Sequence, residues 1–431
     1  MAKWLQCIII AVCCFTLQSR AQFTSVSFSI QAHQDDWQLF MPTQVMVDLN
    51  TNGRKVVFIT LTAGDGSVGA GAYGPSSVPF YLSRENGSIY SSKYAADLTT
   101  VTAPTDVPVA TIATINGHNI TKYVYKNTVN YFLRIPDGNG DGSGFNNTGH
   151  VSLQKLYCRS INTCSGSVCN TGCSNSLSAL GPTPATYNSW SDLTNTIKQI
   201  ITNERVPGTQ SWLHAAHTIT GSNSSYNPGD HSDHRYSSLA AQHAVASGMS
   251  WVGVNGFMDY HSSSQGANLS DTEHENAAAI FALTNWGLIE QSYATNFNSQ
   301  HKGWLPMDFF LVIKNPSGSA PGFTGFTGDE EIPKSNSIIS TLTEIPMIVT
   351  ITSPVYINKD ISMIISPYEP GVLTTAIYDM AGNKITELKT TVEKREPLFI
   401  TLKQAIKTSG TYVVKNILND KYLQTRKITV E

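Results

Sequence analysis

The sequence predicts an α/β protein with a Rossmann-like, mainly parallel sheet flanked by helices, followed by a small C-terminal β-sandwich. Between residues 25 and 289, apolar strand-like segments alternate with segments of helical periodicity, which is the pattern of a doubly wound sheet. Two clusters of histidine and aspartate stand where a strand gives way to a helix, the place where open α/β sheets bind ligands. After residue 349 the pattern changes to short alternating segments separated by turns, as in a β-sandwich.

Length and composition limit the classes of protein to consider. A chain of 431 residues is longer than one ordinary domain, and a hydrophobic content of 41% is sufficient for a real core. Charged residues make up 14% of the chain and the formal net charge is −3. This balance argues against a nucleic-acid-binding protein, which usually presents a basic face.

Residues 1–21 have the organisation of a secretory signal peptide. Lys3 supplies a positive charge, residues 5–17 form an apolar core, and Ser19 and Ala21 provide the small residues that a signal peptidase reads. The apolar run is too short for a membrane-spanning helix. We therefore expect an exported mature chain that begins near Gln22 and has no transmembrane segment.

The elements of the first domain, residues 22–328, follow one another in a regular order. Apolar and β-branched residues are concentrated where we expect strands, at 25–30, 55–62, 129–135, 212–219 and 251–260. Apolar residues have helical spacing where we expect helices, at 41–49, 78–98, 193–203, 235–248 and 272–289. The segments 107–115 and 122–125 indicate a hairpin outside this alternation.

Beyond the first domain the composition changes. Residues 315–327 are rich in Gly, Ser, Pro and Phe and are expected to form a loop, and residues 329–348 a linker. Short alternating segments then predict a β-sandwich over 349–431. Its strands are expected at 349–351, 362–366, 373–379, 398–402, 411–416 and 427–430.

The cysteines of the expected mature chain form one local group. After removal of the signal, four cysteines remain within sixteen residues: Cys158, Cys164, Cys169 and Cys173. An even number in an exported chain predicts two disulfides, and four cysteines allow three pairings that the sequence does not distinguish. The alternative is a four-thiolate zinc site, which we disfavour because the spacing lacks the paired Cys-x-x-Cys form.

The first histidine–aspartate cluster is typical of a catalytic metal site. His33 and Asp36 are three residues apart, so both side chains can point to one side of a helical turn. A histidine from a distant segment, His234, would make a three-ligand set that leaves positions open for water and substrate, as catalytic zinc requires. Asp35 lies between the first two ligands and is placed to exchange a proton with a metal-bound water.

The second cluster spans residues 230–234 and has the sequence Asp-His-Ser-Asp-His. If His234 binds the metal, His231 can polarise a substrate carbonyl and stabilise the oxyanion, and Asp233 can fix the tautomer or charge of a histidine. Either motif alone is common, and Asp230 or Ser232 could simply cap the following helix. Their joint occurrence at strand-to-helix junctions favours the metal site.

In these motifs the sequence resembles the PIG-L/LmbE-like family of zinc-dependent de-N-acetylases. Residues 32–36 (Ala-His-Gln-Asp-Asp) correspond to the family's first motif, Ala-His-Pro-Asp-Asp, and residues 231–234 to its His-x-x-His motif. Between them, residues 62–66 resemble the family's Thr-x-Gly-Glu/Asp loop, residues 84–85 its Arg-Glu pair, and residues 133–138 its Leu-Pro-Asp-Gly strand end. The resemblance covers about residues 24–310, in the family's order.

The resemblance implies a role for each matching residue. It makes His33, Asp36 and His234 the zinc ligands, Asp35 the general base, His231 the electrophilic helper and Arg84 a substrate-binding residue. Two positions depart from the family pattern: Gln34 stands in place of proline and Trp37 in place of an acidic residue. Neither change removes a ligand or the base, and we expect Trp37 to narrow or line the mouth of the site.

The C-terminal region resembles the type IX secretion sorting domains of Bacteroidetes proteins. The likeness lies in residues 376–384, 409–415 and 424–430 and covers roughly residues 353–431. It implies export across the outer membrane by the type IX machinery, leaving the protein secreted or attached to the cell surface. A carbohydrate-binding sandwich is the alternative for this domain.

Together these inferences predict a secreted zinc-dependent hydrolase that removes the N-acetyl group from an N-acetylated sugar or glycan. Zinc is the expected cofactor, although another divalent transition metal could occupy the same ligands. Two alternatives stay open. One is an amidohydrolase acting on a non-sugar N-acyl substrate, and the other is a surface glycan-binding protein without catalysis.

Overall fold

The computed structural model describes most of both expected domains. The described residues are 23–66, 78–99, 108–166, 169–181, 184–219, 221, 224–321, 347–351, 357–367, 371–380, 382–392, 398–402, 406–419 and 422–430. The predicted signal peptide lies outside them, as does the predicted linker except for residues 347–348. No helix within the described ranges is long and apolar enough to cross a bilayer.

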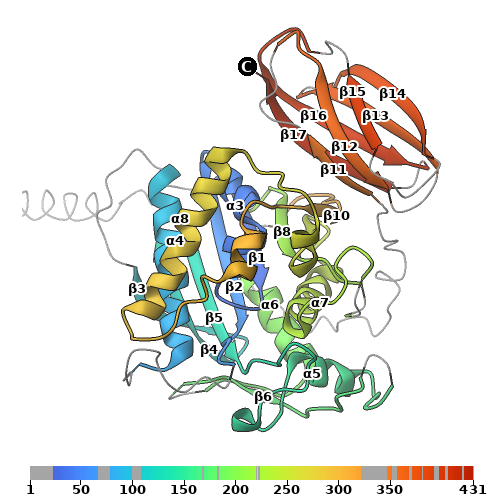
Figure 1. The fold of residues 1–431 in the computed structure, drawn as a ribbon. Coiled ribbons are helices and arrows are strands. Elements are labelled where there is room, and N and C mark those ends of the chain that lie inside the picture. The colour runs from blue at the N-terminus through green and yellow to red at the C-terminus, as the bar shows by residue number, and fades with distance from the viewer. Residues whose placement is uncertain are drawn as a thin grey trace, which may run out of the picture.

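The described part of the first domain contains an eight-stranded sheet of order β10-β9-β8-β1-β2-β5-β4-β3 (Figure 1). Its inner strands are parallel: β1 (Ser25–Gln31), β2 (Arg54–Thr62), β5 (Thr128–Ile135), β8 (Ser211–Ala216) and β9 (Val252–Phe257). The edges are antiparallel: β3 (Val109–Ile115), β4 (His118–Tyr125) and β10 (Phe310–Lys314). The α/β class, the mainly parallel sheet and the hairpin are confirmed.

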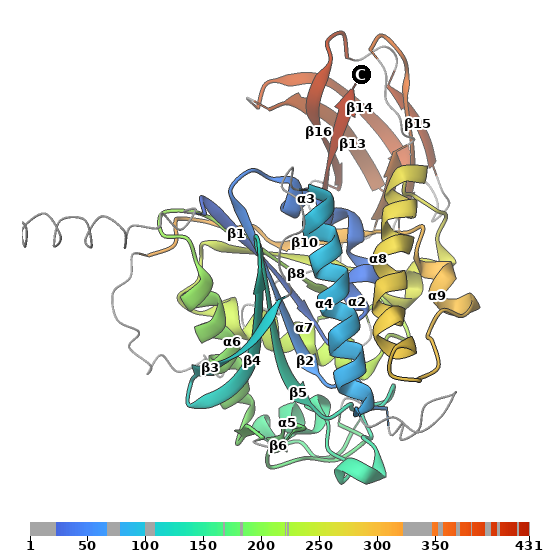
Figure 2. The ribbon, with the colours of Figure 1, turned by 90° about the vertical axis from the view of Figure 1, so that its left-hand side faces the viewer.

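Helices cover both faces of this sheet (Figure 2). One layer contains α6 (Trp190–Glu204) and α7 (Ser232–Ala246), and the other contains α2 (Asp36–Phe40), α3 (Pro42–Asn50), α4 (Phe80–Thr99) and α8 (Asp271–Ile289). The shorter elements among the described residues of this domain are η1 (Asn146–Thr148), α5 (Leu153–Ser160), β6 (Leu177–Ser178), β7 (Thr186–Tyr187), η2 (Tyr260–Ser264) and α9 (Ser299–Trp304). The near-continuous burial of β1 and β2 follows from this double cover.

Helices α4 and α8 approach each other through glycine. A Cβ atom added at Gly87 would lie 2.1 Å from the carbonyl oxygen of Thr284, and one added at Gly287 would lie 2.3 Å from the backbone nitrogen of Gly87. No side chain fits in that space, so only glycine permits this spacing. The contact fixes the position of α4, which carries Arg84.

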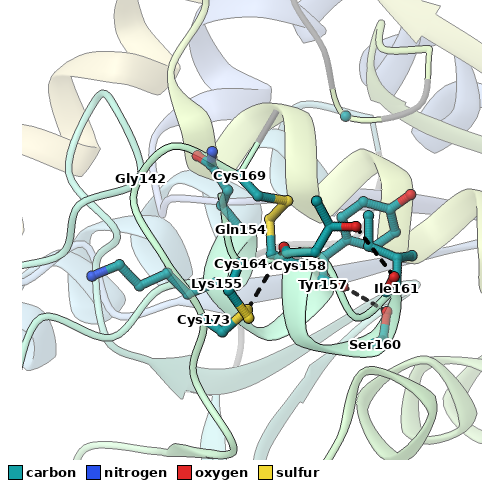
Figure 3. Close-up of a disulfide and its surroundings, with 12 residues drawn as sticks. Gly142, Gln154, Lys155, Tyr157, Cys158, Ser160, Ile161, Cys164, Cys169 and Cys173 are labelled. Atoms are coloured by element: carbon teal, nitrogen blue, oxygen red, sulfur yellow. Dashed lines mark hydrogen bonds between the residues drawn. A yellow bond between two sulfur atoms is a disulfide. The ribbon is translucent and has the colours of Figure 1, made fainter. Parts of the chain in front are cut away.

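The four described cysteines form two disulfides, Cys158–Cys169 and Cys164–Cys173 (Figure 3). The prediction of two local bridges is confirmed, and the structure supplies the pairing that the sequence left open. The four-thiolate zinc alternative is therefore wrong for this structure. The bridges close the chain that leaves α5, the helix that packs on α6 and α7.

The described part of the C-terminal domain contains two antiparallel sheets that share one apolar core. The first contains β11 (Met347–Ile351), β12 (Ile361–Pro367) and β15 (Leu398–Leu402). The second contains β13 (Gly371–Asp379), β14 (Lys384–Val392), β16 (Gly410–Leu418) and β17 (Tyr422–Val430). The predicted β-sandwich architecture is present.

Several boundaries differ from those expected. Helix α7 begins at Ser232, not after His234, so Asp233 and His234 lie in its first turn. Strand β11 begins at Met347, inside the expected linker. The prediction also missed short or polar elements, namely α5, α9, β10 and β14. Segments such as Lys384–Val392 are mostly exposed, so they lack the apolar signal by which strands and helices are recognised.

A buried carboxylate on the inner side of α6 gives the domain a predictable response to acid. Glu204 pairs with Lys55 at 2.6 Å and Lys122 at 2.7 Å and accepts the hydroxyl of Tyr131 at 2.6 Å. Burial raises the pKa of this carboxyl, but the two ammonium groups outweigh it and lower the pKa to about 2. The bonds therefore favour the ionised form in the folded protein.

We predict that this group stabilises the fold above pH 4.5 and that its contribution is lost as the pH falls from 4.5 toward 2. At 1.36 kcal/mol per pH unit, the contribution is up to about 3 kcal/mol. Urea unfolding between pH 5 and pH 3 should show Glu204→Gln to be less sensitive to acid than the unmodified protein. Equal sensitivity of the two proteins would contradict the prediction.

Candidate metal centre

Three side chains from the two sequence clusters converge at the carboxyl end of the sheet. The Nδ1 atom of His33 lies 3.2 Å from Nε2 of His234 and 3.5 Å from Oδ1 of Asp36, and His234 Nε2 lies 3.3 Å from the same oxygen. All three residues are buried. Two ring nitrogens and a carboxylate oxygen therefore face a single point.

These distances fit a tetrahedral metal. Zinc bonds nitrogen and oxygen at about 2.0–2.2 Å, so two ligand atoms in a tetrahedral shell are separated by about 3.3 Å. The three distances between the ligand atoms, 3.2, 3.3 and 3.5 Å, cluster at that value. The donor set of two imidazoles and one carboxylate also suits a first-row transition metal.

The local backbone orients Asp36 for this role. Its Oδ2 atom accepts hydrogen bonds from the backbone N–H groups of Ala32 and His33, both at 2.9 Å. These bonds come from the chain as it leaves β1 and turns into α2. Because they occupy Oδ2, the other oxygen, Oδ1, is directed toward the two imidazoles.

Two carboxylates orient His234 through Nδ1, the ring nitrogen that does not face the other ligands. Its Nδ1 lies 2.8 Å from Oδ1 of Asp230 and 3.1 Å from Oδ2 of Asp259, which follows β9. Asn227 donates to Asp230 at 2.8 Å and holds that carboxylate in place. With its Nδ1 proton directed at carboxylates, the neutral ring presents the lone pair of Nε2 to the metal position.

The surrounding carboxylates make this position strongly attractive to positive charge. Burial lowers the pKa of His33, but Asp36, Asp233 and Asp137 outweigh it and raise the pKa to about 10. The pKa of His234 is also raised, by Asp36 and Asp230 against the effect of burial. A metal ion supplies such charge without requiring protons on the ring nitrogens that face each other.

Asp35 lies beside the ligands but has a different partner. It precedes α2 without capping it, and its Oδ1 accepts a hydrogen bond from Arg84, which also donates to the carbonyl of Gly64 at 2.8 Å. Burial raises the pKa of Asp35, but the Arg84 guanidinium outweighs it and lowers the pKa. The structure thus brings Arg84 to the site, where it orients the carboxylate.

His231 has a defined tautomer because it caps α7. Its Nδ1 accepts the backbone N–H of Asp233 at 3.1 Å, so the proton of the neutral ring is on Nε2. Burial first, and then the neighbouring His33 and His234, lowers the pKa of His231 well below its ordinary value. The ring is therefore a neutral hydrogen-bond donor at the edge of the metal centre.

Asp233 sits between His33 and the loop after β5. Its Oδ2 accepts the backbone N–H of Gly138 at 2.7 Å and lies 3.6 Å from Nε2 of His33. A Cβ atom at position 138 would lie 2.4 Å from the Asp233 carboxylate, which explains the glycine of the Pro-Asp-Gly turn. Asp233 thus lies close to His33, and its expected role of fixing a histidine stays a prediction, with His33 as the histidine.

Two further groups of possible metal ligands overlap the first. One consists of His33, His231 and Asp233, and the other of Asp230, His234 and Asp259. Both share a histidine with the triangle of His33, Asp36 and His234. They therefore surround the same centre, and the described residues form one continuous site.

A cavity of about 180 Å³ opens onto this centre. All the sequence-predicted site residues except Asp233 line it, as does Asp137 of the Pro-Asp-Gly turn. The structure adds others that the motifs did not indicate: Leu39, Phe40, Tyr260, Asn296, His301 and Trp304. Tyr260 stacks on Trp304 with ring centroids 4.7 Å apart and an interplanar angle of 8°. Tyr260 also lies edge-on to the ring of His234, with centroids 5.1 Å apart, so the two aromatic rings form an apolar wall beside the ligands.

The expectation that Trp37 lines the mouth of the site is wrong. Trp37 is fully buried in the core beneath α2 and packs against Phe58, with ring centroids 5.0 Å apart. It does not line the cavity. Gln34, the other departure from the family pattern, donates to the carbonyl of Ala63 at 2.9 Å and ties the first motif to the end of β2.

Comparison with known proteins does not assign the chain to a family. No family model and no curated protein matches the sequence. Solved structures that match in part include a β-glucosidase from Listeria innocua in complex with glucose, at 11% identity over 20% of this chain and 16% of that chain, with a TM-score of 0.16. Another is dimeric latent PorU from Porphyromonas gingivalis, at 18% identity over 20% of this chain and 9% of that chain, with a TM-score of 0.17.

A third partial match is a variant of the superoxide reductase (neelaredoxin) from Ignicoccus hospitalis, at 16% identity over 23% of this chain and 90% of that chain, with a TM-score of 0.17. The chain thus spans less than a fifth of the β-glucosidase and PorU chains. Likenesses at these TM-scores carry no argument about function.

We predict that Asp230→Asn weakens zinc binding about 10- to 100-fold, because the carboxylate that orients His234 is lost. Competition with a chromophoric chelator measures the affinity. The matched control is Asp192→Asn, which changes a second Asp–His pair, with His118 at 2.8 Å, that does not line the cavity. The control should bind zinc normally, and equal affinities of both variants would count against the proposed orientation of His234.

Proposed function

We propose that the protein is an exported, zinc-dependent amidohydrolase that removes the acetyl group from an N-acetylated sugar. The observation that supports this most directly is the triangle of His33 Nδ1, Asp36 Oδ1 and His234 Nε2, with a separate carboxylate, Asp35, on the same cavity. Three protein ligands and a neighbouring base are the requirements of a hydrolytic zinc site.

When bound by His33, Asp36 and His234, a zinc ion supplies Lewis-acid polarisation and lowers the pKa of water. Asp35 is suited to the proton transfers, since its carboxylate lines the cavity and is held ionised by Arg84. It accepts the proton of the attacking water and delivers it to the leaving nitrogen, so the carboxylate is regenerated at the end of the cycle.

His231 is suited to stabilise the negative charge that develops on the carbonyl oxygen. Its Nδ1 is engaged by the helix backbone, so the neutral ring can donate only through Nε2–H. A donor fixed before the reaction stabilises the oxyanion without further reorganisation. Because the lowered pKa keeps this ring neutral, its role is hydrogen bonding and not proton release.

The C-terminal sandwich supports a second part of the proposal, which concerns location. We propose that residues 349–431 act as a type IX sorting domain and that residues 1–21 direct the first export step. The two disulfides agree with an oxidising compartment.

Deleting residues 349–431 in a host that has this machinery should retain the enzyme in the periplasm, and unchanged secretion would refute the assignment.

The proposed base leads to a direct test. Asp35→Asn should lower kcat for deacetylation of N-acetylglucosamine oligomers by about 10²- to 10⁴-fold with zinc content unchanged, because Asp35 belongs to the proton path and not to the metal ligands. Amine release and metal analysis measure the two quantities. Asp141→Asn, in the exposed turn after β5, is the control and should retain full activity.

Turnover of Asp35→Asn at the wild-type rate would remove Asp35 as the base. A wild-type protein that binds zinc and glycan but releases no amine would instead favour a surface glycan-binding protein. Release of amine from other N-acyl compounds alone would retain the reaction but change the substrate class.

A further inference from the structure

A fourth histidine, His301, lines the cavity from α9 and was not indicated by any motif. Helix α9 is capped by Asn298, whose Oδ1 accepts the backbone N–H groups of Gln300 at 3.0 Å and His301 at 3.1 Å. The same oxygen lies 2.8 Å from Nδ1 of His301. His301 is thus tied to the cap of its own helix and lines the cavity at the same time.

These contacts determine the tautomer of His301. Because two backbone N–H groups point at Oδ1 of Asn298, that atom must be the amide oxygen. An amide oxygen cannot donate, so Nδ1 of His301 carries the proton and Nε2 carries the lone pair. Two aromatic rings hold the imidazole in this orientation. Phe281 stacks on it with ring centroids 5.6 Å apart, and Trp304 lies edge-on with ring centroids 5.2 Å apart.

The cavity is therefore lined by a donor imidazole, His231, and by an acceptor imidazole, His301, which have different neighbours. His231 lies against the metal ligands, with ring centroids 4.8 Å from His33 and 5.4 Å from His234. His301 instead interacts electrostatically with Asp35 and Arg84. Burial first lowers the pKa of His301, Asp35 opposes this and Arg84 adds to it, and the net shift is downward.

The proposed reaction orients a substrate relative to these two imidazoles, and the present inference rests on that proposed function. The carbonyl oxygen must face the donor His231, and the leaving nitrogen must face Asp35, which returns the proton. The amine part of the substrate then extends toward His301. Among the described lining residues Arg84 is the one permanently cationic side chain, and Asp35 already neutralises it, which disfavours an anionic amine part.

We propose that His301 is a specificity-determining residue whose Nε2 accepts a hydrogen bond from a hydroxyl group on the amine part of the substrate, next to the amide nitrogen. The site would then select N-acyl derivatives of vicinal amino alcohols over simple N-alkyl amides. An acceptor on a ring held from two sides suits this selection, since it cannot turn to offer a donor.

Two small compounds separate this role from general binding: trans-2-acetamidocyclohexanol, which carries the vicinal hydroxyl, and N-cyclohexylacetamide, which lacks it. The unmodified protein should favour the first in kcat/KM by about tenfold, the effect of one hydrogen bond, mainly through KM. His301→Phe keeps a flat ring against Phe281 and should abolish the preference, while His301→Gln, which supplies an amide oxygen, should restore part of it.

His274→Phe, on the exposed face of α8, is the matched control and should leave the preference unchanged. A preference that persists in His301→Phe, or that is absent from the unmodified protein, would overturn the inference.

A binding measurement keeps this inference distinct from the proposed function. Calorimetry with the amine products, trans-2-aminocyclohexanol and cyclohexylamine, requires no turnover. Tighter binding of the hydroxylated amine, lost in His301→Phe, supports the role of His301 even if no amide is hydrolysed. Equal binding of the two amines contradicts it, whether or not the protein is an enzyme.

Discussion

The site depends on one carboxylate, that of Asp36, whose two oxygens have different partners. One of its oxygens accepts two backbone N–H groups at the end of β1, and the other lies within 3.5 Å of both His33 Nδ1 and His234 Nε2. The backbone thus fixes the direction in which the second oxygen points. Because Asp36 is buried with further carboxylates around it, the arrangement requires positive charge at the imidazoles, which either ring protons or a bound metal ion supplies. This requirement links the fold to metal chemistry.

Sheet topology explains how distant segments meet at this carboxylate. Strands β1 and β8 are parallel neighbours, as are β8 and β9, so the loops after all three open at the same edge. The first supplies His33 and Asp36, the second Asp230 and His234, and the third Asp259. Close packing of α4 on α8 through Gly87 and Gly287 brings Arg84 to the same edge. The disulfide-closed chain after α5 lies on the side of α6 and α7.

The sequence predicted the site residues that belong to short, recognisable motifs. His33, Asp35, Asp36, His231 and His234 were expected together and are found together, as is Arg84. It could not find Tyr260 or His301, because neither lies in a recognisable motif and α9 is too short to show periodicity. Trp37 was misplaced because its neighbours suggested the cavity, whereas the turn into α2 directs its ring to the core. Asp259 could have been suspected, since it lies at the carboxyl end of a predicted strand.

We propose that one zinc ion binds between His33, Asp36 and His234. A crystal structure of the zinc-loaded protein, with diffraction data collected on both sides of the zinc absorption edge, tests this most directly. We expect one anomalous peak at about 2.0–2.2 Å from Nδ1 of His33, Oδ1 of Asp36 and Nε2 of His234. An anomalous peak elsewhere, or zinc-saturated crystals with no peak between these three atoms, would contradict it.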